Sequence, residues 1–292
     1  MEFLSYMISG INLGSVYAII ALGYTMVYGI AKMLNFAHGD VIMVGGYISL
    51  CAMTYWGVPS IVAILLAMIV CTVLGVVIEG LAYKPLRQAT SLAVLITAIG
   101  VSYFLQNAAL LIWGANPRVY TSVVTDTLKL FDGRLSVPCI SLVTVVVCVV
   151  IMIGLTLFTS KTKLGKAMRA CSEDKGAAQL MGINVNRTIS MTFAIGSALA
   201  AIAGVLLCSS YPTLMPTTGS MPGIKAFTAA VFGGIGSIPG AFLGGILLGI
   251  IESFAKAYIS TQLANVIVFA VLIVVLLVKP SGLLGKYVPE KV

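Results

Sequence analysis

The feature that most constrains this sequence is a series of long apolar segments with almost no charge inside them. There are eight such segments, near residues 7–30, 38–56, 59–83, 91–114, 138–159, 188–209, 225–255 and 262–279. A helix of about 17–25 apolar residues spans the roughly 30 Å hydrocarbon core of a bilayer. Charged residues make up 9% of the chain, against about 25% in soluble domains. We therefore expect an all-α fold, a polytopic helical membrane protein, rather than a β-barrel with short alternating segments.

The number of transmembrane helices depends on the segment 225–255, which is too long for one simple span. The sequence GGIGSIPG at 233–240 interrupts it, and glycine with proline propagates a regular helix poorly. This segment could form two short spans or a re-entrant hairpin. We therefore expect about eight transmembrane helices, or nine if the segment crosses twice. We expect a single transmembrane domain over 1–292. Residues 7–30 read as its first membrane helix and not as a signal peptide, because no basic region precedes them.

Orientation follows from the basic residues, which mark cytoplasmic loops. They gather around 84–87, in the loop 161–187 and after residue 279, so all three regions are predicted to be cytoplasmic. The loops 115–137 and 210–224 are then external, and the segment 225–255 has to cross twice or not at all. The N-terminus is external if each early segment crosses once. This bias accounts for the net charge of +8 without nucleic-acid binding.

The loop 161–187 is the longest polar stretch of the chain, and it reads KTKLGKAMRACSEDKGAAQLMGINVNR. Within it, we predict a short helix that begins with Ser172 as N-cap. Glu173 and Asp174 would occupy the first turn, where the helix dipole favours acids. Gly182 would take the left-handed position after the last turn.

The predicted helix carries Ala177, Leu180 and Met181 on one face. It would be only about 15 Å long, and a helix so short needs a surface to pack on. Two surfaces remain open: anionic lipid headgroups, or the groove of a cytoplasmic protein partner. The small Ala177 and Ala178 would allow a partner to approach closely.

Three sequence blocks resemble one family. The pattern E-D-x-x-A-A-x-x-x-G-I-N, from Glu173 to Asn184, resembles the cytoplasmic-loop motif of ABC-importer permeases, although their usual E-A-A start reads E-D here. Residues 10–40 and 225–252 resemble the branched-chain amino-acid permeases of that class, specifically the smaller of the two membrane subunits.

The resemblance implies a permease subunit of an ATP-driven importer for branched-chain and related amino acids in the bacterial inner membrane. It implies a second homologous permease, two cytoplasmic ATPase subunits, and a periplasmic or extracellular substrate-binding protein. It also implies a coupling helix that docks on an ATPase subunit, formed here by Glu173, Asp174, Ala177, Ala178, Leu180, Met181 and Gly182. Relatives for urea or short amides have similar permeases, and they stay open as an alternative.

No cofactor or catalytic group is expected on the chain itself. The sequence contains no G-x-x-x-x-G-K-[ST] motif, so ATP and Mg²⁺ would bind to the partner subunits. The only histidine, His38, has no other histidine and no nearby cysteine with which to form a metal site.

Two rival functions compete with the importer. A stand-alone secondary transporter for a small polar or amphipathic solute would need intramembrane carboxylates. A membrane-embedded enzyme would need clustered catalytic residues. The sequence offers little of either.

Two polar or glycine-rich interruptions are the candidates for the translocation core. Non-helical backbone at membrane depth is tolerated only against protein or a watery cavity, and transporters place it along the substrate path. The candidates are Asn35, His38, Asp40, Gly233, Gly234, Gly236 and Gly240. Asn35 and Asp40 would cap adjoining helix ends or hold a gate. The path should otherwise be mostly neutral, with Asn12, Gln106 and Asn107 as polar lining and a local pair between Glu252 and Lys256.

Overall fold

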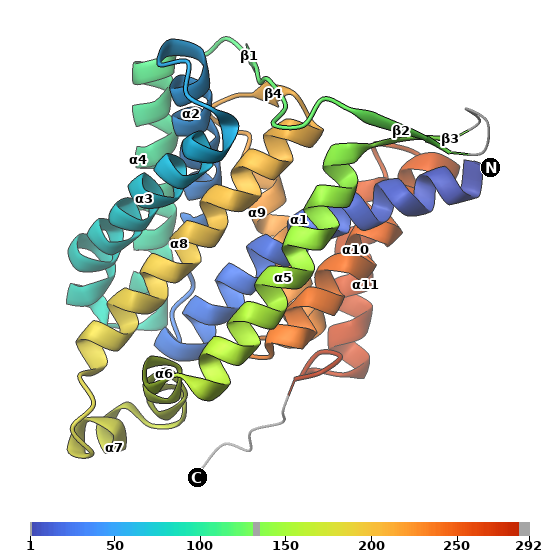
Figure 1. Ribbon diagram of the computed structural model, residues 1–292. Coiled ribbons are helices and arrows are strands. Elements are labelled where there is room, and N and C mark those ends of the chain that lie inside the picture. Colours follow the sequence, from blue (N-terminus) through green and yellow to red (C-terminus); the bar gives the residue numbers. More distant parts are fainter. Residues whose placement is uncertain (1, 131–134, 286–292) are drawn as a thin grey trace.

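The structure, a computed structural model, describes residues 2–130 and 135–285 as a bundle of helices (Figure 1). Among the described residues, six helices are long and apolar enough to cross a membrane. They are α1 (Glu2–Ala31), α3 (Ser60–Ile78, extended by the π-turn Glu79–Tyr83 and the 3-10 turn Lys84–Leu86), α4 (Ser91–Trp113), α5 (Cys139–Lys161), α8 (Val185–Ser210) and α10 (Ile238–Tyr258). The bundle also contains the shorter α2 (His38–Tyr55), α9 (Ser220–Gly233) and α11 (Ala264–Val278). The expected polytopic all-α membrane fold is confirmed.

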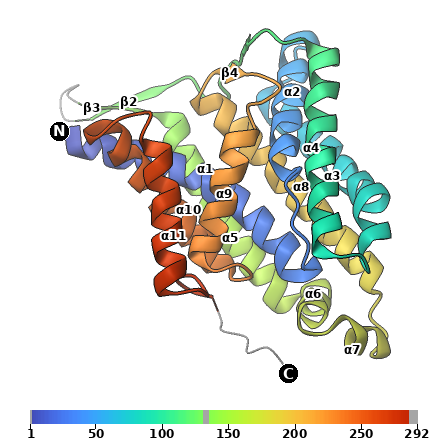
Figure 2. The same ribbon diagram turned by 180° about the vertical axis from the view of Figure 1, so that it is seen from behind.

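The two ends of the bundle differ in structure. At one end lie the short helices α6 (Lys163–Glu173) and α7 (Lys175–Leu180), together with the segment after α11 (Figures 1 and 2). At the other end β1 (Arg118–Val119) pairs with β4 (Thr213–Leu214), and β2 (Thr127–Leu130) pairs with β3 (Leu135–Pro138), both antiparallel. We call these the α7 end and the strand end. The β1–β4 pair joins the connections 114–138 and 211–219, both of which we predicted on one side.

The outer helices present apolar side chains to their surroundings. Large hydrophobic residues are exposed along α3, α4, α5 and α11, among them Ile61, Ile69, Phe104, Leu111, Val146, Val150, Val266 and Leu277. Such a continuous apolar surface would aggregate in water, and it suits contact with lipid or with other membrane helices.

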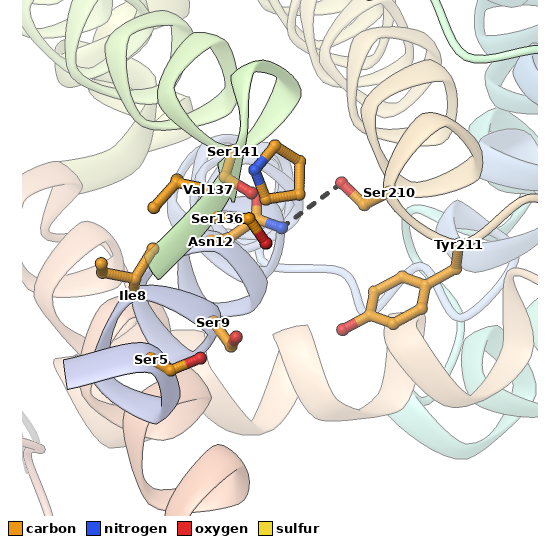
Figure 3. A pocket seen from close by; sticks show the side chains of 10 residues that line it. Ser5, Ile8, Ser9, Asn12, Ser136, Val137, Ser141, Ser210 and Tyr211 are labelled. Atoms are coloured by element: carbon orange, nitrogen blue, oxygen red, sulfur yellow. Dashed lines mark hydrogen bonds between the residues drawn. The ribbon is translucent and has the colours of Figure 1, made fainter. Parts of the chain in front are cut away.

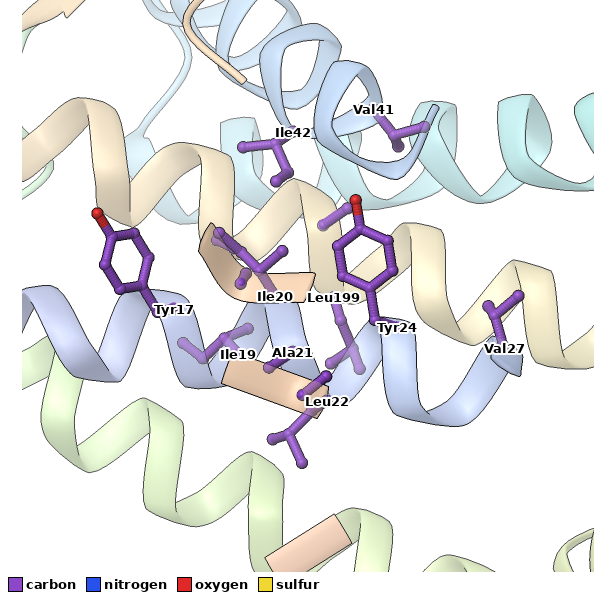
Figure 4. Packing of buried hydrophobic residues seen from close by; sticks show 14 of the residues in the cluster. Tyr17, Ile19, Ile20, Ala21, Leu22, Tyr24, Val27, Val41, Ile42 and Leu199 are labelled. Carbon is purple, nitrogen blue, oxygen red and sulfur yellow. The ribbon is translucent and has the colours of Figure 1, made fainter. Parts of the chain in front are cut away.

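Helix α1 lies at the centre of the bundle. Residues 12–27 are buried throughout, and α1 contacts α5, α8, α9 and α10. Figure 4 shows its side chains, including Ile19 and Leu22, packed among neighbours such as Ile42 of α2 and Leu199 of α8. A helix that is apolar all round is one that other helices cover on every side.

Glycines bring α1 and α10 into backbone contact. A Cβ placed on Gly249 would lie 2.2 Å from the Cα of Gly14, and one on Gly245 would lie 2.4 Å from the Cα of Ala18. Small residues four apart allow membrane helices to approach this closely.

The interrupted segment 225–255 forms two antiparallel helices, α9 and α10, joined by a turn at 234–237. Gly234 has a φ of +105°, a conformation that residues with a Cβ rarely adopt. The turn lies at the α7 end, where the segment after α11 is hydrogen-bonded to the end of α9 through Leu283 N–H and the Phe232 carbonyl at 2.9 Å.

We expect Gly249→Ala to destabilise the bundle, because the new methyl group overlaps the backbone of Gly14. Overpacking of this kind costs about 1–3 kcal/mol, which lowers the thermal midpoint by about 2–10 °C. Thermal unfolding of the detergent-solubilised protein measures it. Gly154→Ala on α5 is the matched control, because a Cβ there meets nothing within 4 Å. Equal midpoints for both variants would contradict the close α1–α10 contact.

Candidate functional site

The loop 161–187 forms two helices rather than the one that we predicted from Ser172. Ser172 and Glu173 belong to the last turn of α6, where the Ser172 hydroxyl donates to the Arg169 carbonyl at 2.7 Å. Asp174 has extended backbone and is the N-cap of α7. Its Oδ1 accepts from the N–H groups of Gly176 at 2.8 Å and Ala177 at 3.0 Å. The prediction of Ser172 as N-cap was wrong, because a serine can bond back within a helix while the following aspartate caps equally well.

The end of α7 matches the prediction. Gly182 has a φ of +81°, and the N–H of Ile183 donates to the Ala178 carbonyl at 3.0 Å. This six-to-one bond after a left-handed glycine is a Schellman motif, so the chain turns sharply away from α7 at this point.

Helix α7 presents an apolar edge to its surroundings. Leu180 is 90% exposed and Met181 is 82% exposed, and the neighbouring Ala177 is exposed as well. We call these three residues the α7 edge. Exposed apolar side chains grouped on a short polar-loop helix make the α7 edge a candidate contact surface.

Ala178 lies on the opposite side of α7 and does not belong to the edge. It is buried in a cluster with Met168 and Cys171 of α6 and with Met26 and Ile30 of α1. In this region α6 packs on α1, and α7 packs on α6.

A direct contact between α7 and α1 comes from Lys175, whose ammonium donates to the Ala31 carbonyl at 2.7 Å. Burial, together with the neighbouring Arg87 and Lys32 cations, lowers the pKa of Lys175 below its ordinary value. The hydrogen bond from Lys175 supplies a donor for the Ala31 carbonyl, one of the last carbonyls of α1, which have no partner within the helix.

The polar interruption between α1 and α2 forms tertiary hydrogen bonds. Asn35 Oδ1 accepts from the Tyr83 hydroxyl at 2.9 Å, and Asp40 Oδ1 accepts from Gln106 Nε2 of α4 at 2.9 Å. The N-cap of α2 is Ala37, with no side-chain cap. The expectation that Asn35 and Asp40 cap helix ends was therefore wrong, since tertiary partners use their oxygens. The alternative, that they hold a gate, stays a prediction.

His38 is buried and packs edge-to-face on Tyr24, with ring centroids 4.7 Å apart. Next to it Gly39 lies against Gly219 and Gly223, so the beginnings of α2 and α9 meet. Within the described residues, no three His, Cys, Asp or Glu side chains gather as metal ligands.

The structure does not bring the two predicted interruptions together. Gly233 and Gly240 face each other across the α9–α10 turn, Gly234 contacts Gly285, and Gly236 approaches Gly29 at the end of α1. The interruption at 35–40 instead contacts α4 and the beginning of α9.

At the strand end lies a buried ion cluster that was predicted only in part from the sequence. Glu252 of α10 is fully buried, and its Oε1 accepts from Lys225 of α9 at 2.7 Å and from Lys256 at 2.6 Å. Its Oε2 accepts from the Tyr17 hydroxyl at 2.9 Å. The predicted Glu252–Lys256 pair is confirmed. Lys225 was read as the edge of an apolar segment, and a lysine followed by 26 residues without any charge was the overlooked signal.

Two cavities share Tyr211 in their walls, and one of them borders this cluster. One, of about 220 Å³, is lined by Lys225, Glu252, Lys256 and Tyr17 and by apolar side chains such as Met221. The other, of about 210 Å³, is lined mainly by hydroxyl groups and by Asn12, whose amide donates to Ser210 Oγ at 3.4 Å (Figure 3).

Of the three amides expected as polar lining, only Asn12 borders one of these cavities. Its buried Oδ1 has no hydrogen-bond partner among the described residues. Gln106 is bound to Asp40 instead, and Asn107 donates to the carbonyl of Tyr103 within its own helix.

Comparisons with known proteins agree with this architecture. Residues 6–276 match the family described as the permease component of the branched-chain amino acid transport system. The chain belongs to this family. It is 46% identical over 302 residues to the high-affinity branched-chain amino acid transport system permease protein BraD of Pseudomonas aeruginosa, covering 100% of this chain and 98% of the relative. LivH of Escherichia coli K12, which has the same description, is 45% identical over 310 residues with the same coverage.

The family membership makes the chain a multi-pass membrane permease subunit and not an enzyme, as expected from the sequence. The fold itself is similar to a solved structure, PsaBC from Streptococcus pneumoniae in complex with Fab, with a TM-score of 0.50 and 15% identity. The alignment covers 96% of this chain and 93% of that one.

We expect Glu252→Gln to destabilise the protein strongly, because it leaves two lysines without their carboxylate. Breaking a buried ion pair by removing one partner costs about 3–5 kcal/mol. Thermal unfolding of the solubilised protein measures the loss, with the exposed Glu173→Gln as the control. Adding Lys225→Met to Glu252→Gln should recover part of the loss. A Glu252→Gln protein as stable as the control would refute a structural role for the pairing.

Proposed function

We propose that this chain is a permease subunit of an ATP-driven importer that carries branched-chain amino acids into a bacterial cell. The observation that supports it most is the similarity of the whole chain, at 45–46% identity, to permease proteins of high-affinity branched-chain amino acid transport systems. The proposed partners are a second homologous permease, two cytoplasmic ATPase subunits that hold ATP and Mg²⁺, and an external substrate-binding protein.

We propose that the chain crosses the bacterial cytoplasmic membrane nine times. Helices α1, α2, α3, α4, α5, α8, α9, α10 and α11 would be the crossings, of which α9 and α11 are the shortest, with 14 and 15 residues. Basic residues gather at the α7 end, in the loop 161–187 and around Lys84 and Arg87, which favours a cytoplasmic position for this end. The strand end, with the N-terminus, would then be external.

Helix α7 is proposed as the coupling helix. Its exposed edge of Ala177, Leu180 and Met181 would lie in a groove of an ATPase subunit. Its buried residue Ala178 lies in the cluster in which α6 packs on α1, and Lys175 is hydrogen-bonded to the last turn of α1. Closure of the ATPase dimer would push α7, and α1 would carry this displacement into the bundle, so that the permease alternates between its outward and inward openings.

Replacement of both Leu180 and Met181 by serine should abolish this coupling. We expect loss of ATPase subunits from the affinity-purified complex and at least a tenfold fall in ATP-dependent leucine uptake, because the apolar contact is removed while α7 keeps its caps. Gln179→Ser is the matched control, since Gln179 is an exposed neighbour outside the edge.

Two results would contradict the proposal. If the double variant retains its ATPase partners and normal uptake, α7 is not the coupling helix. If the unaltered protein purifies without any ATPase, the importer assignment itself fails.

A further inference from the structure

The cavity that borders the ion cluster of Lys225, Glu252 and Lys256 holds one more positive than negative charge. The two ammonium groups share a single carboxylate. Lys225 is buried and paired with Glu252, whereas the Lys256 side chain is 37% exposed, so water reaches the second ammonium group where it lines the cavity. A buried charge needs a partner, and Glu252 supplies one for Lys225. A group with a negative charge inside the cavity would complete the pairing.

Both lysines have hydrogen-bonding capacity left for such a group. An ammonium carries three N–H donors, and within the described residues Lys225 and Lys256 each donate to one acceptor, Glu252. Glu252 in turn has both oxygens occupied, one by the lysines and one by Tyr17. The carboxylate therefore fixes the two ammonium groups in place, and the free N–H donors stay available to a ligand.

The rest of the cavity wall is apolar on one side. Leu13, Leu207, Met221 and Pro222 line it together with the charged groups. The volume, about 220 Å³, lies below the range of about 300–1,000 Å³ that drug-sized ligands occupy. A small molecule with one carboxylate and one aliphatic side chain fits both the charge and the lining.

The position of the cavity suits entry from the strand end. Thr213 and Thr218, in the connection between α8 and α9, form part of its wall. Glu252 lies six residues before the end of α10 at Tyr258, which is about 9 Å along the helix. The charged groups are thus reached from the strand end without passing the centre of the bundle.

We propose that this cavity is the first binding site of the transported amino acid within the permease, with Lys225 and Lys256 holding its carboxylate and the Leu13–Leu207–Met221 wall holding its side chain. The proposal rests on the proposed function, since it takes branched-chain amino acids as the substrate. It assigns to this chain a part in substrate recognition in addition to that of the external binding protein.

The charge of the cavity can be tested apart from transport. Met221→Cys places a thiol on the wall of the cavity, where Met221 is 43% exposed. In the assembled complex it should react several times faster with a sulfonate-bearing methanethiosulfonate than with a trimethylammonium-bearing one. Each rate is normalised to that of a free small thiol and corrected for the unmodified chain, which has six cysteines of its own. Ser9→Cys, on the uncharged neighbouring cavity, is the matched reporter and should show no preference.

Adding Lys256→Gln to Met221→Cys should bring the ratio close to one, and Lys256→Arg should preserve it. Lys256 is the suitable lysine, because Glu252 keeps Lys225 as a partner when Lys256 is replaced. An equal ratio in the Gln and Arg variants would overturn the assignment of the excess charge to this cluster.

Occupancy by the substrate is measured with the same thiol. Millimolar leucine should slow the labelling of Met221→Cys several-fold, whereas leucinamide, which lacks the carboxylate, should not. Equal protection by both compounds, or by neither, would overturn the carboxylate site.

Leucine uptake by the unaltered complex separates this result from the proposed function. Uptake without protection by leucine rejects the site alone. The complex can also label faster with the anionic reagent and yet take up no leucine. This result rejects branched-chain amino acids as the substrate, and it rejects the cavity as their binding site.

Discussion

The backbone contact between α1 and α10 determines how the other helices of this permease are arranged. With no side chain larger than a methyl between Gly14, Ala18, Gly245 and Gly249, the two helices form one unit. Helices α5, α8 and α9 surround α1 on its remaining sides. In a bilayer, where helix association gains little from the hydrophobic effect, such close packing is a main source of stability. The unit also brings Tyr17 of α1 to Glu252 of α10, so the buried charge of the strand end depends on the same contact.

Helix α1 thereby connects two regions that are far apart. Its first half lines both cavities of the strand end, through Asn12 in one and Tyr17 in the other. Its last turn holds α6 and α7 through Met26, Ile30 and the Ala31 carbonyl. Helix α8 also contacts α6 and α7, and it lines the two cavities through Ser210 and Leu207. In the proposed mechanism α1 and α8 are therefore the physical links between the substrate cavity and the coupling helix.

The sequence allowed the fold class and most helix positions to be predicted, because long uncharged segments have few other stable arrangements than membrane helices. Gly182 was predicted correctly for the same kind of local reason, since few residues other than glycine suit a left-handed position after a helix. The failures are of two kinds. At Ser172 and Asp174, two good N-caps stand close together, and only tertiary packing of α6 on α1 decides between them.

The second kind concerns contacts between distant segments. Lys225 and Glu252 are 27 residues apart, and nothing local in the sequence indicates that α9 and α10 fold back at the glycine turn to join them. Asn35 and Asp40 were recognised as important polar groups, but their partners Tyr83 and Gln106 lie on other elements. Roles that depend on such pairings cannot be read from spacing along the chain.

The glycine contacts between α1 and α10 also limit how this protein can move. Interlocked backbones cannot slide or rotate past each other without separating, so a push on the last turn of α1 is transmitted along the helix instead of being absorbed by rearranged side chains. The outer helices α3 and α4 lie outside this contact, since α3 packs on α2 and α8 and α4 packs on α2, and they retain that freedom. The α1–α10 pair therefore acts as a rigid lever whose two arms end at α7 and at the charged cavity, and any hinge of the transport cycle has to lie outside it.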